Sequence, residues 1–126
     1  MAVPPRLTSL SPVATKLVMA IRFLALCARS RQDPVAHLTS RLGSVTAAKA
    51  LLDLADCAAH SWPETVQVCK PCCCALSPDE SVFAGMAEAA RRGDREGFGE
   101  VLSGFIRTDR HERLYAHAVE AVAHIG

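Results

Sequence analysis

Three helix-start signals, in each of which Ser or Asp directly precedes Pro, constrain the fold of this 126-residue chain more than any other feature. They are Ser11-Pro12, Asp33-Pro34 and Ser77-Pro78. A Ser or Asp side chain accepts hydrogen bonds from free amides at a helix start, and Pro is favoured at the first helical position. Glu80, three residues after Ser77, completes the pattern of a capping box. Each pair therefore predicts a helix start.

Apolar residues at helical spacing follow these signals and indicate an all-α fold. Gly43 and Gly93 are typical helix ends, Ser44 is a further cap, and Trp62-Pro63 stops the helix that Ser44 begins. The expected helices begin at Pro12 and Pro34, follow Ser44, and cover residues 78–92, 94–107 and 110–125. We predict a single domain over residues 1–126, built as a bundle of five or six helices, with residues 1–10 loose.

The first expected helix is apolar over more than half of its circumference. One stripe contains Val13, Leu17, Ala20, Leu24 and Cys27, and the face beside it contains Val18, Ile21 and Ala25. Such a helix lies at the centre of a bundle or is buried in an oligomer. The apolar run of residues 17–28 is shorter than the ~20 residues that cross a bilayer, and Arg22 interrupts it. Because a secretory cleavage site is also lacking, we expect a cytoplasmic protein with reduced cysteines.

An extended crossover is expected at residues 64–76. Thr65-Val66-Gln67-Val68 alternates polar and apolar residues, two of which are β-branched valines, as a strand does. No second strand is recognisable in the sequence. The segment is therefore either merely extended or pairs with its copy across a two-fold axis.

Four of the six cysteines lie within the segment Cys69-Lys70-Pro71-Cys72-Cys73-Cys74. The two-residue gap between Cys69 and Cys72 allows one loop to present two thiolates to one ion, and Cys73 and Cys74 are further possible ligands. His60, near the end of the third helix, is the best ligand that is not a cysteine. These five residues form a candidate site for a soft metal such as zinc. Cys27 and Cys57 lie on apolar stripes and are expected in the core.

Two other readings of the cysteine segment stay open. Cys69-Lys70-Pro71-Cys72 resembles the Cys-x-Pro-Cys motif of thioredoxin-like proteins. That resemblance implies thiol exchange by a thiol whose pKa is lowered at a helix N-terminus, although the alternating strands of a thioredoxin sheet are absent from the pattern. Alternatively, the small cysteines only pack into a tight turn, since free Cys is among the most buried residue types.

The run Pro71-Cys72-Cys73-Cys74, followed by Ala-Leu-Ser-Pro-Asp-Glu, resembles small uncharacterised bacterial helical proteins in which such a run precedes a helix. The resemblance covers these residues alone. It implies a helix after the cysteines and no particular activity.

The charges favour neither nucleic acid nor catalysis. The net charge is +1, but residues 1–50 carry +6 and residues 51–126 carry −5. The arginines of the last third are interleaved with acidic residues, which suits surface ion pairs better than phosphate contacts. Asp53, Asp56 and His60 share a helix face that we expect to be solvated. No catalytic set is recognisable, so we do not predict an enzyme.

The sequence therefore predicts a small cytoplasmic helical binding or interaction protein whose cysteine loop binds a soft metal such as zinc. The competing prediction is a metal-free homodimer that uses the apolar first helix or residues 65–68 as its interface. A thiol-redox protein that uses Cys69 and Cys72 stands third.

Overall fold

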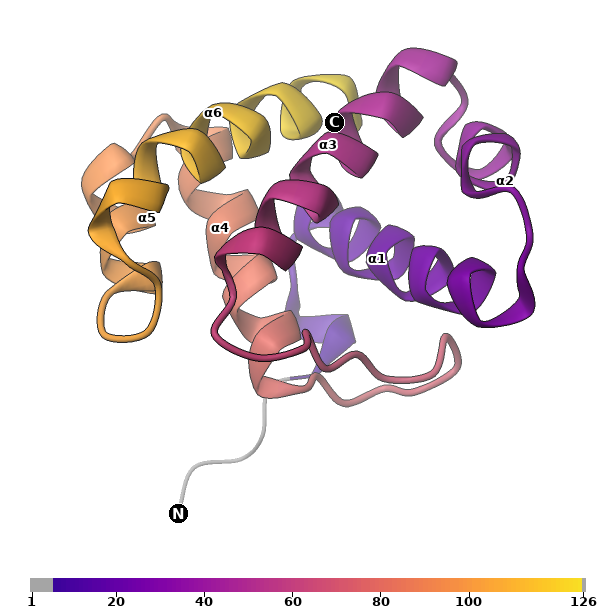
Figure 1. Ribbon diagram of the computed structural model, residues 1–126, viewed down its shortest axis with the longest axis horizontal. Helices are drawn as coiled ribbons and strands as arrows, with labels where there is room; N and C mark the ends of the chain where they lie inside the picture. Colours follow the sequence, from indigo (N-terminus) through magenta and orange to yellow (C-terminus); the bar gives the residue numbers. More distant parts are fainter. Residues whose placement is uncertain (1–5, 126) are drawn as a thin grey trace.

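The computed structural model describes residues 6–125, and this part of the chain folds into six α-helices and one short 3₁₀ helix (Figure 1). The α-helices are α1 (Pro12–Ser30), α2 (Pro34–Leu42), α3 (Val45–Ser61), α4 (Pro78–Arg92), α5 (Arg95–Leu102) and α6 (Thr108–Ile125). No strand forms among residues 6–125, and the residues between α3 and α4 are a long extended crossover. The predicted all-α bundle is therefore confirmed.

The three predicted helix starts are confirmed by their hydrogen bonds. The Ser11 hydroxyl accepts from the Ala14 amide, and the Asp33 carboxylate accepts from the Val35 amide. At α4 both halves of the capping box form: the Ser77 hydroxyl accepts from the Glu80 amide, and the Glu80 carboxylate accepts from the Ser77 amide. These caps satisfy amides that would otherwise lack partners, which fixes where the helices begin.

The first helix packs against four of the other five helices. α1 packs against α2, α3, α4 and α6, while α3 lies along α6 on the other side of the core. The core consists mainly of Leu, Ala and Phe side chains from α1, α3, α4 and α6. Its fully buried members include Leu17, Leu51, Leu54, Phe83, Met86 and Leu114. Packing against four helices accounts for much of the broad apolar surface of α1.

The prediction for the fifth helix is wrong at its C-terminal end. The helix ends at Leu102 and not at residue 107, because the chain turns at Gly104, whose φ is +94°. Phe105 lies after the helix but still packs edge-on against Trp62, with the ring centroids 5.5 Å apart. The apolar pattern that predicted a longer helix was therefore produced partly by Phe105 and Ile106, which pack against the core after the turn.

The chain before α1 packs against the end of the crossover. Residues 7–9 form the 3₁₀ helix within the segment predicted to be loose, of which residues 1–5 lie outside the described residues. The Leu7 amide donates to the carbonyl of Cys74 at 2.8 Å, and Arg6 forms an isolated antiparallel bridge with Ala75. Within residues 6–125, no helix is long and apolar enough to cross a membrane.

Candidate functional site: the cysteine crossover and the adjoining groove

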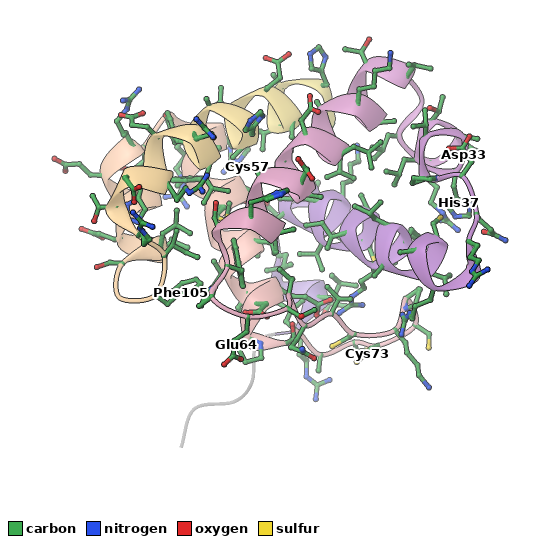
Figure 2. The ribbon with its side chains drawn as sticks, viewed as in Figure 1. Asp33, His37, Cys57, Glu64, Cys73 and Phe105 are labelled. Atoms are coloured by element: carbon green, nitrogen blue, oxygen red, sulfur yellow. The ribbon has the colours of Figure 1, made fainter. Side chains whose placement is uncertain are left out.

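The crossover between α3 and α4 runs out and back as two arms. A turn joins them, closed by a 3.0 Å hydrogen bond from the Cys73 amide to the Lys70 carbonyl. The first arm, residues 64–70, carries the strand-like sequence, and the return arm, residues 73–76, leads to the Ser77 cap. Figure 2 shows Glu64 and Cys73 on this crossover, at the edge of the molecule below α1 and α3.

The first arm is fixed at its start by Trp62 and by the first turn of α4. The Trp62 ring stacks on Phe83 with the centroids 4.9 Å apart. The Trp62 indole donates to one oxygen of Asp79 at 3.1 Å, and the Gln67 amide donates to the other at 2.7 Å. One carboxylate at the start of α4 therefore binds both Trp62, just before the arm, and Gln67 within it.

Glu80 binds the first arm further along. Its carboxylate accepts from the Cys69 amide at 3.0 Å and from the Ser77 amide at 2.9 Å. Only 1% of Glu80 is exposed, so a carboxylate of this kind needs a positive partner. That partner is Arg22 of α1, whose guanidinium donates to both Glu80 oxygens, at 2.7 and 3.0 Å.

The fully buried guanidinium of Arg22 also holds the return arm. It donates to the carbonyls of Cys73 and Ala75 at 2.7 and 2.8 Å, and it contacts the Met19 sulfur at 4.0 Å. With the two bonds to Glu80, its five N–H groups all have partners. The Arg22–Glu80 pair thus joins α1, α4 and both arms of the crossover.

This buried pair was not predicted. In the sequence, Arg22 appears only as an interruption of the apolar run of the first helix, and Glu80 only as the last residue of a capping box. One signal of a buried ion pair was available. Arg22 lies in the middle of a helix that is apolar on most sides, and an arginine in such a place is buried only with a partner. The sequence contains many carboxylates and gives no means of choosing Glu80 among them.

The buried pair shifts two pKa values in opposite directions. Burial alone would raise the pKa of Glu80, but the hydrogen bonds from Arg22, Ser77 and Cys69 outweigh it and lower this pKa to about 2. Burial raises the pKa of the Cys69 thiol to about 11, and Glu80 and Cys73 add to the increase. Cys69 is therefore almost entirely in the protonated thiol form at neutral pH. Thiol exchange instead requires a thiol whose pKa is lowered.

The four clustered thiols do not face one point. Cys69 and Cys73 are half-buried, whereas Cys72 and Cys74 are exposed. His60 lies at the exposed end of α3, where its Nδ1 is 2.8 Å from the carbonyl oxygen of Asp56. Among residues 6–125, no three His, Cys, Asp or Glu side chains are placed to hold one metal ion. Zinc binding by the predicted residues therefore stays a prediction that needs the loop to rearrange.

The two remaining cysteines are core residues, as predicted. Cys27 of α1 is 1% exposed and Cys57 of α3 is 8% exposed. Neither belongs to the crossover, so the candidate chemistry is confined to four thiols.

The thiols should differ in reactivity. A pKa raised from 9.0 to about 11 reduces the thiolate fraction of Cys69 at neutral pH about 100-fold. We expect iodoacetamide to alkylate the exposed Cys72 and Cys74 well before Cys69 in the folded, reduced protein. Mass spectrometry of a time course at neutral pH measures the order, and the denatured protein, in which all sites are equivalent, is the control. Alkylation of Cys69 as early as Cys72 would contradict the described environment.

Next to the crossover, an apolar groove of about 180 Å³ lies between α1, α3 and the first arm. Four residues of α1, two alanines of α3, two valines of the arm and Phe83 line it. They are Ile21, Leu24, Ala25, Ala28, Ala55, Ala59, Val66, Val68 and Phe83. The sequence suggested two separate interface candidates, the apolar first helix and the strand-like segment. In the structure, the uncovered apolar surface of α1 and the strand-like segment line the same groove.

A second, polar pocket of about 200 Å³ lies between α3 and α6. The face of Asp53, Asp56 and His60 meets Arg110, Arg113 and His117 there. The acidic residues and His60 are exposed, as predicted for a solvated face. The mixed charges and the openness to solvent do not define one ligand.

Comparison with protein-family models, with curated proteins and with solved structures found no match to this chain.

Proposed function

We propose that this protein is a helical interaction protein that works as a homodimer, with the groove face as the interface between the two copies. The observation that carries the proposal is the groove itself, since it combines the uncovered apolar surface of α1 with the extended first arm. Apolar surface left open between elements is typical of sites that another protein covers.

The size of the groove favours protein side chains over a cofactor. Its volume of about 180 Å³ is below the roughly 300–1,000 Å³ of typical small-molecule sites. Alanines line both helical walls, so that a partner backbone can approach closely. The +6 charge of residues 1–50 and the −5 charge of residues 51–126 also favour association of unlike surfaces of two copies.

Lysine substitutions in the groove test the homodimer. Ala28 and Ala59 line the groove, are exposed, and lie in the last turns of α1 and α3, where a cation suits the helix dipole. We expect Ala28→Lys and Ala59→Lys to remain folded but to become monomeric, because each places a charge inside the apolar interface. Light scattering of the eluting protein gives the mass.

The matched control is Ala123→Lys, which changes an exposed alanine in the last turn of α6, outside the groove. It should keep the mass and the thermal unfolding midpoint of the wild-type protein. A wild-type protein that is monomeric at every concentration, or groove variants that stay dimeric, would refute this interface.

Binding of a soft metal such as zinc by the cysteine loop is a second proposal. It is supported by the sequence, in which four thiols lie within six residues and Cys69 and Cys72 have the two-residue gap of zinc-binding loops. Cys69, Cys72, Cys73, Cys74 and His60 are the candidate ligands. Anaerobic purification, followed by measurement of bound metal and free thiols, tests it.

In that experiment we expect stoichiometric metal that is lost in Cys73→Ser and retained in Cys27→Ser, because Cys27 lies in the core. A metal-free protein in which every thiol is free would exclude the proposal. The homodimer does not depend on this result, since none of the four clustered cysteines lines the groove.

A further inference from the structure

We propose that the two copies pair their first arms as antiparallel strands, with the two-fold axis at Gln67, so that residues 64–70 of one copy run against residues 70–64 of the other. This inference rests on the proposed homodimer and adds its register and its contacts. It follows from the hydrogen bonds of the arm and from the order of its side chains.

The arm has one edge that is occupied and one that is free. The amides of Gln67 and Cys69 donate to Asp79 and Glu80, and the Gln67 carbonyl accepts from the Ser77 hydroxyl at 2.6 Å. In an extended chain the N–H and C=O groups of alternate residues point to opposite edges. The main-chain groups of Val66 and Val68 therefore point to the outer edge, where no hydrogen bond within residues 6–125 involves them.

The return arm differs in this respect. Its carbonyls at Cys73 and Ala75 accept from Arg22, and its carbonyl at Cys74 accepts from the Leu7 amide on the opposite edge. Both edges of the return arm are thus occupied. An exposed strand edge with unpaired main-chain groups is a template for pairing with another chain, and among residues 6–125 the first arm has such an edge.

In one register, the side chains of the arm in one copy are complementary to those of the arm in the second copy. When Gln67 lies opposite Gln67 of the second copy, Val66 lies opposite Val68, and Glu64 lies opposite Lys70. Glu64 and Lys70 are both exposed, and neither forms a salt bridge within residues 6–125. The two-fold axis therefore creates two opposite-charge pairs at the ends of the ribbon, a favourable cross-strand arrangement.

The same register also gives hydrogen-bond partners to the main-chain groups on the free edge. Val66 and Val68 become hydrogen-bonded pairs, in which each residue exchanges an N–H and a C=O with its opposite. Their side chains, which line the groove, join the valines of the second copy on one face of the ribbon. Slipping the register by one residue would turn polar side chains to that face. Hydrogen bonding, charge and burial thus agree on one arrangement.

Charge reversal tests the register. Glu64→Lys and Lys70→Glu each place like charges opposite one another twice, so we expect each to raise the dimer dissociation constant about tenfold. The double variant Glu64→Lys/Lys70→Glu restores both opposite-charge pairs and should return the constant to within about twofold of the wild-type value. Sedimentation equilibrium at low salt gives the constants. The exposed Glu96→Lys and Lys49→Glu, outside the arm, are the controls for net charge.

The outcomes separate this inference from the proposed function. If the wild-type protein is dimeric but the single reversals have no effect beyond their controls, or the double variant does not recover, the register is wrong and the homodimer stands. If the wild-type protein is monomeric at all concentrations, both fail. Recovery in the double variant also shows that neither substituted side chain by itself prevents folding or pairing.

Discussion

Replacing Arg22 with Met is expected to lower the free energy of unfolding by about 3–5 kcal/mol, because it leaves the buried carboxylate of Glu80 without its positive partner. It also removes the donors to the carbonyls of Cys73 and Ala75, so both arms of the crossover loosen. Urea unfolding at neutral pH and one fixed protein concentration measures the change, since a dimer makes stability depend on concentration.

The matched control is Arg29→Met, which changes an exposed arginine of the same helix and should alter stability by no more than about 0.5 kcal/mol. A second comparison uses Arg22→Met/Glu80→Gln, which removes both charges. This double variant should be less destabilised than the sum of the two single variants, because it leaves no unpaired charge in the core. An Arg22→Met variant as stable as Arg29→Met would show that the pair does not hold the crossover.

Acid should unfold the protein partly through Glu80. The pKa of Glu80 is about 2 in the folded protein against 4.5 for an ordinary Glu, so the unfolded chain binds the proton first. The stability that this group contributes is complete above about pH 5 and is lost as the pH falls toward about 2. The shift corresponds to a loss on the order of 3 kcal/mol. Urea unfolding over this pH range measures it.

The Glu80→Gln variant isolates that contribution. We expect it to be less stable than the wild-type protein at neutral pH. Because residue 80 then no longer titrates, the stability curves of the two proteins should converge as the pH falls. The exposed Glu96→Gln should follow the wild-type curve. Parallel curves for wild type and Glu80→Gln would mean that the pKa of Glu80 is not lowered by folding.

Local signals in the sequence predicted most of the fold. The caps at Ser11, Asp33 and Ser77 act within four residues of themselves, and so a pattern of neighbours is sufficient to place them. The end of α5 was missed for the opposite reason. Phe105 is packed against Trp62 far along the chain, and its apolar character therefore extended a helical pattern beyond the turn at Gly104.

The candidate site was predicted only in its parts. The crossover, its four cysteines and the strand-like arm were recognisable, but the partners of each depended on the packing of distant segments. The contact of Arg22 with Glu80 spans 58 residues, and the groove brings α1, α3 and the arm together. Neither could be found by spacing along the chain. The rule that a charge is buried only with a partner explains why Arg22 needs a carboxylate. It does not predict which carboxylate of the chain that is.

The most direct test of the account is residue-resolved amide hydrogen exchange along the first arm at several protein concentrations. The amides of Gln67 and Cys69 donate within the molecule, so they should be protected at every concentration. The amides of Val66 and Val68 point to the free edge and should become protected only as the concentration rises and copies pair. Equal exchange at all four amides, independent of concentration, would contradict both the anchored inner edge and the pairing of the outer one.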